Sequence, residues 1–321
     1  MLDLDLKTLQ LVAAIAETGS VTSAAERAGV TQSAASQALR RAEALIGAPL
    51  FDRGRRPLTP TAVGRMVASR AHDLARDAAS LLADARAAAE LPGRIDLRIG
   101  LVDSLAGTIG ARIVKELADG ALALSVTAWS GLAHSHAEAL MRREIDAALT
   151  CDPMEGLADM ERILLFREPY VLIAPRGAAD ELRTLTLREV LESRRLVRHS
   201  ARSHAGRQVE RHLERMGLRP PRAFEFDTSD ALVAMVATGM GVAITTPLCL
   251  LQGLAHAAAV VALPLPGPGF SRDLLLTMRR GDLETLAPRI ADVARAVARS
   301  HALPQISVMV PWLTSESLAL A

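Results

Sequence analysis

The sequence predicts an α/β protein in three parts: a small helical head that ends in a hairpin, a long helix, and a larger α/β body. Three observations support this prediction. Apolar residues recur at helical spacing up to about residue 46, one helical pattern runs from residue 59 to about residue 90, and short alternating strands and helices follow Gly93. With 321 residues, the chain is long enough for two or three domains.

The composition fits a packed globular protein. Hydrophobic residues make up 50% of the chain and charged residues 23%, and the net charge is +1. No stretch reaches about 18 uninterrupted apolar residues, which argues against a membrane span, and the acidic start of the chain is unlike a secretory signal. Cys151 and Cys249 are the only cysteines, which excludes a disulfide framework and favours a reducing compartment. We therefore expect a cytoplasmic protein.

The head is predicted to contain three helices, each with its own start and stop. The first covers residues 6–18 with Asp5 as its N-cap, and Ser20 begins a short second helix rich in alanine. Thr31 caps the third, which runs to about residue 46. Glycines at positions 19, 29 and 47 follow the three helices, as expected of residues that end a helix.

A basic hairpin and a long helix follow. The hairpin strands are expected at residues 50–53 and 56–58, and Thr59-Pro60 is expected to begin the helix, because Pro is favoured at the first helical position. Apolar residues at alternating steps of four and three then form a heptad seam, which predicts pairing with a second chain. Packing of the helix on its own domain is the alternative. The seam consists of Val67, Ala71, Leu74, Ala78, Leu81, Ala85 and Ala88.

The third helix is predicted to have one apolar and one polar face. Ala35, Leu39 and Ala42 share the apolar face, and the opposite face holds groups that hydrogen-bond bases and phosphates. With the basic hairpin, this arrangement predicts a winged helix-turn-helix that binds double-stranded DNA, and an ordinary polar surface helix is the alternative. The predicted DNA-binding residues are Ser20, Thr31, Gln32, Ser33, Ser36, Gln37, Arg40, Arg53, Arg55 and Arg56.

The body is predicted to bind a small molecule beyond the carboxyl ends of its strands, as open α/β sheets do. A basic run between residues 194 and 207 lies at a strand-to-helix junction and favours a carboxylate ligand, although a solvated charged surface is the alternative. Trp129 is expected either to wall the pocket or to fill the core. The predicted ligand-binding residues are Asp103, Ser104, Trp129, Ser130, Thr150, Cys151, Arg198, His199, Arg202 and Thr228.

The segment LDLKTLQLVAAIAETGSVTSAAERAGVTQSAASQALRRAEALIGAPLFDRGRRPLTPTAVG resembles the head of LysR-type transcriptional regulators. The segments REIDAALT, LFREPYVLIAP and VATGMGVAITTP resemble parts of the effector domain of that family, so the resemblance extends to about residue 300. The chain departs from the family pattern at Val21, where an aromatic residue is usual, at residues 31–33, where Ser-Gln-Pro is usual, and at Ala35, where Val is usual. The resemblance implies a regulator that binds promoter DNA and a small-molecule effector.

The resemblance also implies how the chain is organised. It places a winged helix-turn-helix domain at residues 1–58, a linker and dimerisation helix at 59–91, and an effector-binding domain at 92–300. Two subdomains, residues 93–165 with 268–300 and residues 166–267, would hold the effector in a cleft, as in periplasmic binding proteins. Residues 301–321 show no clear pattern and are expected to form a loose tail. The resemblance further implies a homodimer through the helix and a homotetramer through the effector domains. It also implies that the cleft closes on the effector.

Three other functions have less support in the sequence. An enzyme is disfavoured because the sequence contains no G-x-S-x-G motif, Walker loop, metal-spaced His/Cys cluster or dinucleotide fingerprint, so no catalytic residue, metal or cofactor is expected. A purely architectural DNA-binding protein would not need the large α/β body. A redox trigger at Cys151 is the third, and an isolated cysteine is more often a small buried apolar residue.

Overall fold

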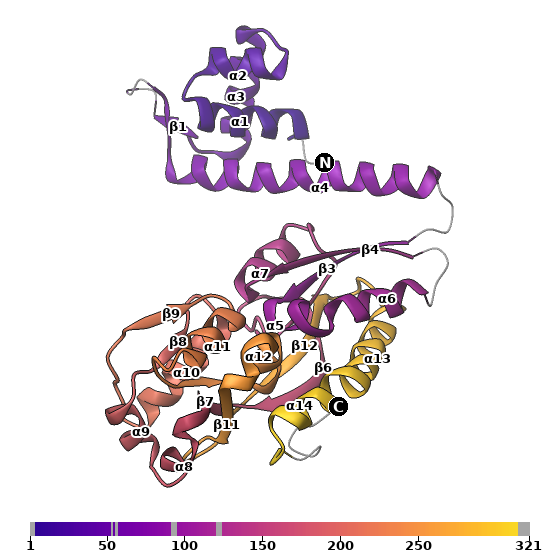
Figure 1. Cartoon of the computed structure of the whole chain (residues 1–321). Coiled ribbons are helices and arrows are strands. Elements are labelled where there is room, and N and C mark those ends of the chain that lie inside the picture. The colour runs from indigo at the N-terminus through magenta and orange to yellow at the C-terminus, as the bar shows by residue number, and fades with distance from the viewer. Residues whose placement is uncertain (1–3, 53, 55–56, 91–94, 120–123, 314–321) are drawn as a thin grey trace. The chain divides into compact units, whose positions relative to one another are not determined.

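In the computed structural model, the chain divides into two units, residues 1–92 and residues 93–321, which we call the head unit and the effector unit. The structure describes residues 4–52, 54, 57–90, 95–119 and 124–313. Each unit has its own hydrophobic core, and the elements of both are labelled in Figure 1.

The head unit contains the three predicted short helices, a small hairpin and the long helix. Each short helix begins at its predicted cap, because the side chains of Asp5, Ser20 and Thr31 accept the backbone N–H groups of the residues three positions later. The predicted starts of these helices are therefore confirmed. The elements are α1 (Leu6–Thr18), α2 (Val21–Ala28), α3 (Gln32–Ile46), β1 (Phe51–Asp52), β2 (Thr59–Pro60) and α4 (Ala62–Glu90).

The hairpin and the long helix meet later in the chain than predicted. Thr59 and Pro60 form strand β2, in which Thr59 is opposite Asp52 and Pro60 is opposite Phe51. The helix begins after them, because the Thr61 hydroxyl accepts the backbone N–H of Gly64 at 3.0 Å. The prediction that Thr59-Pro60 begins the helix and that the second strand ends at residue 58 was therefore wrong. Proline fits β2 because an edge strand does not need its missing N–H.

The first turns of α4 pack on their own head. Ala68 and Ala71 are buried, and Val63 and Val67 pack against the core that α1 and α3 share. Two residues of the predicted heptad seam, Val67 and Ala71, thus face the head, and pairing through the start of the seam was a wrong expectation. Farther along, Leu74 is exposed and available to a partner. The side chains of the last three seam residues, Leu81, Ala85 and Ala88, lie outside the described part of the chain.

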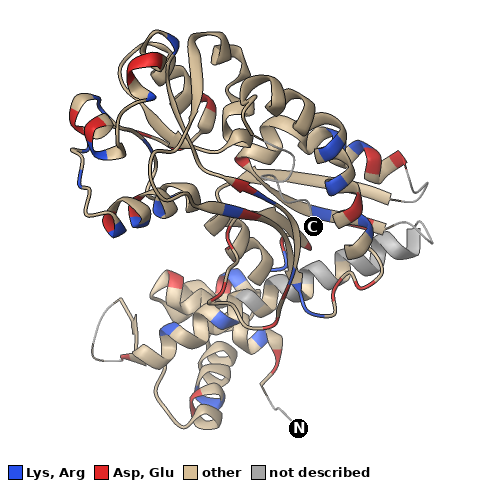
Figure 2. Cartoon of the chain, turned by 90° about the horizontal axis from the view of Figure 1, so that it is seen from below, with Lys and Arg blue, Asp and Glu red and all other residues tan. Residues whose placement is uncertain are grey.

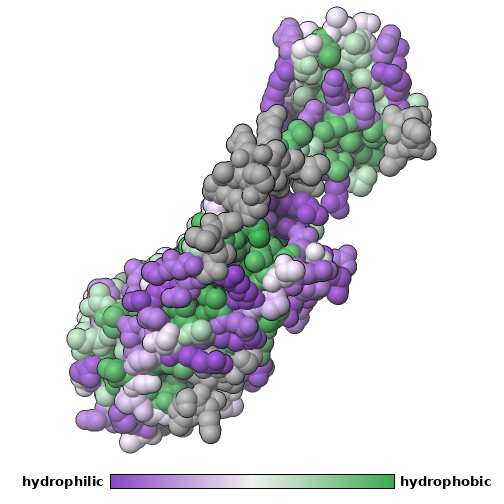
Figure 3. All heavy atoms as spheres, turned by 90° about the vertical axis from the view of Figure 1, so that its right-hand side faces the viewer, coloured by the Kyte–Doolittle hydropathy of each residue, from purple (hydrophilic) through white to green (hydrophobic). Residues whose placement is uncertain are grey.

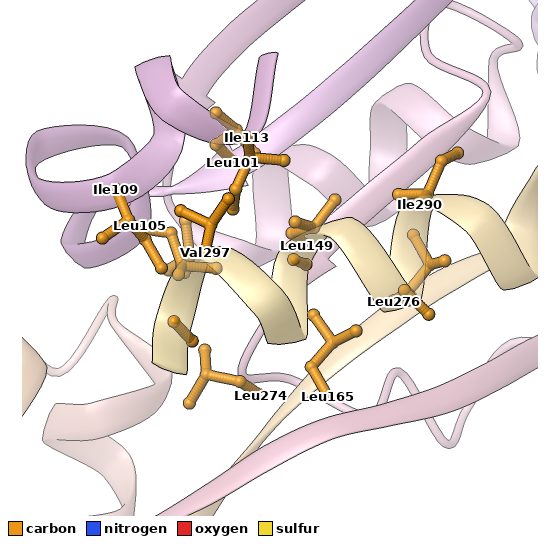
Figure 4. Close-up of a cluster of buried hydrophobic side chains, with 14 of the residues drawn as sticks. Leu101, Leu105, Ile109, Ile113, Leu149, Leu165, Leu274, Leu276, Ile290 and Val297 are labelled. Atoms are coloured by element: carbon orange, nitrogen blue, oxygen red, sulfur yellow. The ribbon is translucent and has the colours of Figure 1, made fainter. Parts of the chain in front are cut away.

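The first half of the effector unit is built on a five-stranded sheet with strand order β4-β3-β5-β12-β6. Strand β3 pairs in parallel with β4 and β5, and β12 pairs antiparallel with β5 and β6. Leucine and isoleucine side chains from this sheet, α6 and α13 form the largest core, as Figure 4 shows. The strands are β3 (Ile95–Val102), β4 (Leu124–Gly131), β5 (Ala147–Thr150), β6 (Met160–Pro169) and β12 (Ser271–Arg279). The helices are α5 (Asp103–Leu105), η1 (Ala106–Gly110), α6 (Ala111–Asp119), α7 (Ala133–Met141), α13 (Ala287–Val297), η4 (Ala298–Ala302) and α14 (Leu303–Met309).

The second half of the effector unit holds a three-stranded sheet, in which β7 lies between β10 and β11, and a parallel pair of β8 and β9. The chain passes between the halves after Pro169 and before Ser271, so β6 stays in the first sheet beyond the boundary predicted at residue 165. The strands are β7 (Val171–Pro175), β8 (Val197–His199), β9 (Phe224–Phe226), β10 (Ala243–Thr245) and β11 (Val260–Pro264). The helices are η2 (Arg176–Ala178), α8 (Ala179–Leu182), α9 (Leu187–Ser193), α10 (His204–Arg215), α11 (Ser229–Ala237), α12 (Pro247–Gln252) and η3 (Leu254–Ala259).

The part of the predicted tail that the structure describes, residues 301–313, is folded onto the unit. Leu303 and Ile306 pack against the core of the first half, and Val310 is buried in a core of the second half. The indole N–H of Trp312 donates to the carbonyl oxygen of Ala262 at 3.0 Å. Leu303, Ile306 and Val310 recur at helical spacing and make the packing contacts with the two cores. Pro304 does not prevent the helix, because proline is tolerated in the first turn.

The surface of the chain is mixed in charge and in hydropathy. Figure 2 shows acidic and basic residues interspersed on the effector unit, and Figure 3 shows hydrophilic residues bordering the apolar ones on the face of the head that it displays. Among the described residues, none of the helices is both long and apolar enough to cross a membrane.

Candidate nucleic-acid interface and effector cavity

Helix α3 separates a buried stripe from an exposed polar face. Ala35, Leu39 and Ala42 are at most 6% exposed and pack in the head core. Ser33, Gln37 and Arg40 are exposed on the other side, Ser36 is half-buried, and the side-chain amide of Gln32 donates to the Ser36 hydroxyl at 3.3 Å. The structure thus brings the predicted α3 side chains together on one face, where amide, hydroxyl and guanidinium groups can hydrogen-bond base edges and phosphates.

Other predicted DNA-binding residues have structural roles or lie outside the described chain. The Ser20 hydroxyl caps α2, and the Thr31 hydroxyl caps α3 by accepting the N–H of Ala34 at 3.2 Å. These caps fix the starts of the two helices that form the helix-turn-helix. Arg53, Arg55 and Arg56, at the tip of the hairpin, lie outside the described residues.

The effector unit contains a cavity of about 30 Å³ between its two halves, at the carboxyl ends of β3, β4 and β5. Four of the residues predicted to bind the ligand line this cavity: Asp103, Ser104, Cys151 and His199. The rule that ligands bind at the carboxyl ends of parallel strands therefore located a cavity in the structure. The remaining lining residues are Val102, Leu132, Ala133, Ser203, His204, Ala205, Asp227, Ser229, Cys249 and Arg272.

Several predicted ligand-binding residues lie elsewhere. Trp129 and Ser130 are exposed on the edge strand β4 and do not line the cavity. Thr150 is buried, and its hydroxyl accepts the backbone N–H of Asp152 at 3.2 Å. Thr228 directly precedes α11, between Asp227 and Ser229, which both line the cavity.

The two arginines predicted to bind a carboxylate are occupied by other groups. Arg198 is 4% exposed, with its Nε 3.0 Å from a Glu210 oxygen, and it also donates to the Pro220 carbonyl oxygen. Arg202 is exposed and lies 3.4 Å from Asp227. Arg198 and His199 are neighbours on β8, and successive side chains of a strand point to opposite sides. His199 therefore lines the cavity, and the prediction that Arg198 does so as well was wrong.

Arg272, which lines the cavity, belongs to a buried ion pair that the sequence did not reveal. Arg272 on β12 is opposite Glu168 on β6, and its Nε donates to a Glu168 carboxylate oxygen at 2.7 Å. The other carboxylate oxygen accepts the backbone N–H of Leu248 at 2.9 Å. Glu168 is fully buried and Arg272 is 2% exposed. The two residues are 104 positions apart, so only the register of the sheet brings them together.

Two histidines line the cavity in different settings. His199 is buried, its Nε2 lies 2.9 Å from the Thr245 hydroxyl, and burial lowers its pKa to about 3, so its ring is neutral near pH 7. His204, at the start of α10, lies 3.2 Å from Asp152, which also accepts from Arg207 at 2.9 Å. Hydrogen bonding to His204 is the main cause that lowers the pKa of Asp152 to about 2. Because Asp152 follows β5, these contacts join the two halves of the unit.

Three helices of the effector unit begin at the cavity. Ser203 caps α10 by accepting the N–H of Gly206 at 2.9 Å. Helix α7 has no side-chain cap, and Ala133 in its first turn lines the cavity. At the start of α11, the Asp230 carboxylate already bonds the Thr228 hydroxyl and backbone N–H groups. Uncapped N–H groups and the positive end of the helix dipole favour an anionic group at such a place.

The cysteines and the other polar groups do not form a metal site. Cys151 and Cys249 are free and buried, and burial raises the pKa of the Cys151 thiol, which keeps it protonated near pH 7. Within the described ranges, no group of three or more histidine, cysteine, aspartate or glutamate side chains is arranged to hold a metal ion.

Comparison with known proteins places both units in one family. Residues 93–299 match the model of the LysR substrate binding domain, and residues 6–65 match that of the bacterial regulatory helix-turn-helix protein, lysR family. The small neutral protease regulatory protein of Streptomyces coelicolor is 31% identical over 310 residues, which cover 93% of this chain and 89% of that protein. Its counterpart in Streptomyces lividans is also 31% identical, over 93% of this chain and 85% of that protein.

Solved structures share the fold at low sequence identity. A peroxide-bound OxyR mutant of Corynebacterium glutamicum superposes with a TM-score of 0.60 at 18% identity, over 97% of both chains. CbnR in complex with its target DNA gives a TM-score of 0.59 at 17% identity, over 92% of this chain and 100% of that one.

Proposed function

Because the chain belongs to the LysR family of bacterial DNA-binding transcriptional regulators, we propose that α3 recognises promoter DNA and that the effector cavity binds a small carboxylate. The observation that carries the first part is the exposed polar face of α3 above its buried apolar stripe. The chain is a regulator and not an enzyme. A cytoplasmic location is part of the proposal, because the partner of the head is DNA.

The roles of the DNA-binding residues differ between the helix and the hairpin. Arg40 is the guanidinium on the exposed face of α3, so we propose that it contacts a base edge or a nearby phosphate, while Arg53, Arg55 and Arg56 contact the DNA backbone. With one arginine on the recognition face, much of the affinity then comes from phosphate contacts and from pairing two heads on two half-sites.

Two substitutions test these roles. Duplexes selected by the protein from a random pool, and unselected duplexes, serve as probes in anisotropy titrations at several salt concentrations. Arg40→Ala should relax the preference for selected DNA by about 1–3 kcal/mol. Arg55→Ala should weaken binding to all sequences and flatten the salt dependence. If both variants act alike on every sequence, the assignment of roles is wrong.

Dimerisation is proposed to use the part of α4 that extends beyond its contact with α1. Leu74 is 48% exposed and Leu82 is 57% exposed, and a second copy of the helix would cover them. Two linked heads would then bind two half-sites of one promoter, and a tetramer through the effector units would bind four.

The proposed ligand is a carboxylate because the uncapped helix start of α7 faces the cavity. The nearby cations are already neutralised, Arg272 by Glu168 and Arg198 by Glu210, so the backbone amides have to provide most of the attraction. A panel of carboxylates and their uncharged amides, compared by their effect on thermal unfolding, tests this class. Equal stabilisation by the acids and their amides would exclude a carboxylate as the ligand.

The size of the cavity bears on the regulatory mechanism. About 30 Å³ is room for about two water molecules, whereas ligand pockets usually have hundreds of Å³. A ligand of several heavy atoms has to enlarge the cavity, so we propose that the effector separates the halves of the unit, in place of the closure expected from the family resemblance. The separation would change the spacing of the DNA-binding heads, provided that the effector binds the two arrangements with different affinity.

A further inference from the structure

The guanidinium of Arg272 bonds Glu168 through one nitrogen and the cavity side chains through another. Its Nε donates to the Glu168 carboxylate, and its Nη2, 2.6 Å from the same carboxylate oxygen, donates to the Ser104 hydroxyl at 3.1 Å and to the Cys249 sulfur at 3.4 Å. Nη2 carries two hydrogens, one for each of these acceptors. Sulfur is a weak acceptor, so the hydrogen that bonds Cys249 is the one that a stronger acceptor can take.

The Nη2 atom of Arg272 lies where the cavity meets the hinge. Ser104, Cys249 and Arg272 all line the cavity. Arg272 and Glu168 are opposite each other on β12 and β6, next to the two places where the chain crosses between the halves of the unit.

Helix α12 connects the same ion pair to both cores. Its first turn is held through Glu168, which accepts the N–H of Leu248. Leu248 and Leu251 pack in the core of the first half, and Leu250 packs in a core of the second half. A shift of Glu168 therefore reaches the packing of both halves through one short helix.

We infer that Arg272 couples the effector cavity to the hinge. An oxygen of the effector takes the Nη2 hydrogen that now bonds Cys249, the guanidinium moves with it, and Glu168 transmits the movement to the start of α12. The inference rests on the proposed function, in which a carboxylate enters this cavity. Arg272 is then a contact for the effector and the positioning residue for Glu168, whereas the helix start of α7 supplies most of the affinity.

A pair of matched variants separates this role from a merely structural one. Arg272→Lys keeps a positive charge beside Glu168 but loses the planar fork that reaches Ser104 and Cys249. Arg279→Lys makes the same change on the same strand, where the guanidinium donates to the carbonyl oxygens of Leu140 and Ile145 and does not line the cavity. Hydrogen–deuterium exchange of the full-length protein, followed in the peptide with residues 246–253, reports on the start of α12.

The first measurement uses no ligand. Arg272→Lys should speed exchange in this peptide by about tenfold, because Glu168 no longer holds the Leu248 amide in place. Arg279→Lys should leave this exchange as in the unsubstituted protein, even where it lowers the melting temperature. Equal exchange at residues 246–253 in the two variants would overturn the role of Arg272.

The second measurement adds acetate as the probe. Acetate should protect the first turn of α7 in the unsubstituted protein and in both variants, and should change exchange in α12 about fivefold. In Arg272→Lys only the change in α12 should be lost, and a change that persists there would refute the coupling. If acetate does not protect α7 in the unsubstituted protein, the proposed carboxylate site is wrong, and the ligand-free comparison alone decides on Arg272.

Discussion

The two units present their polar groups in opposite ways. On α3, Gln37 and Arg40 are exposed above a stripe that is already packed, so DNA can exchange water for base contacts without disturbing the head core. In the effector cavity, Arg272 is neutralised by Glu168, and Asp152 is held by His204 and Arg207. A ligand that enters there has to compete with contacts that hold the fold together. The polar groups of the head are thus free to contact a partner, whereas those at the cavity already have partners within the protein.

The largest expected difference between the units comes from breaking one ion pair in each. Glu168→Ala leaves a buried guanidinium without its partner and should lower the free energy of unfolding by about 3–5 kcal/mol. Glu17→Ala, in the head, removes exposed contacts to Arg27 and His72 and should cost less than about 1 kcal/mol. Urea denaturation followed by circular dichroism measures both.

A double variant serves as the control for this prediction. Replacing both Glu168 and Arg272 by leucine removes the two buried charges together and should recover most of the loss. Equal losses in Glu168→Ala and Glu17→Ala would contradict the contrast between the two units.

A second test uses acidity. Burial lowers the pKa of His199 to about 3 and that of His136 to about 4, and His136 is 3% exposed. Both rings stay neutral in the folded chain but gain a proton in the unfolded chain below its pKa of about 6.5, so stability falls as the pH falls from there toward the folded values. At pH 5 each histidine should cost about 2 kcal/mol.

Tryptophan fluorescence follows this loss in the effector unit, because both tryptophans, Trp129 and Trp312, belong to it. Urea titrations at pH 7 and pH 5 give the difference in the free energy of unfolding between the two pH values. His199→Gln, which retains a hydrogen-bonding group near Thr245, should remove the contribution of His199, about 2 kcal/mol, from this difference. An unchanged pH dependence in this variant would show that His199 does not contribute.

These contrasts also explain which features the sequence could predict. Helix caps, glycine stops and the two faces of α3 depend on residues within a few positions of one another, so Asp5, Ser20 and Thr31 were identified correctly. Thr59-Pro60 was assigned to the helix because proline suits both a first helical turn and an edge strand. Only the contact between the hairpin and α4 decides between the two.

The cavity could be predicted only in part, because it is assembled from distant segments. The ends of the strands indicated Asp103, Ser104, Cys151 and His199 correctly as cavity residues. The pair of Glu168 and Arg272 depends on the register between two strands that are far apart in the chain, and the sequence contains no local sign of that register. The DNA contacts of α3 and the ligand contacts of the cavity remain predictions.

A third test concerns the contact that fixes the hairpin on α4. A Cβ atom at Gly64 would lie 1.9 Å from the carbonyl oxygen of Leu50, a backbone atom that cannot turn away. Gly64→Ala should therefore displace the hairpin, lower the stability of the head by about 1–3 kcal/mol and weaken DNA binding. Gly177→Ala, where nothing lies within 4 Å of the added atom, is the control and should change stability by less than about 0.5 kcal/mol. Unaltered DNA binding by Gly64→Ala would show that the hairpin position does not matter.

The smallest expected effect compares an exposed helix cap with a buried one. Thr31 caps α3 at the surface, where water can replace its hydroxyl, so Thr31→Ala should cost about 1 kcal/mol. Ser203 caps α10 beside the cavity and is 8% exposed, so Ser203→Ala leaves the N–H of Gly206 buried and should cost about 1–3 kcal/mol. Urea denaturation measures both. If Thr31→Ala lowers the free energy of unfolding as much as Ser203→Ala does, the start of α3 is as enclosed as the start of α10. The contrast between an exposed recognition surface and a closed effector site would then be wrong.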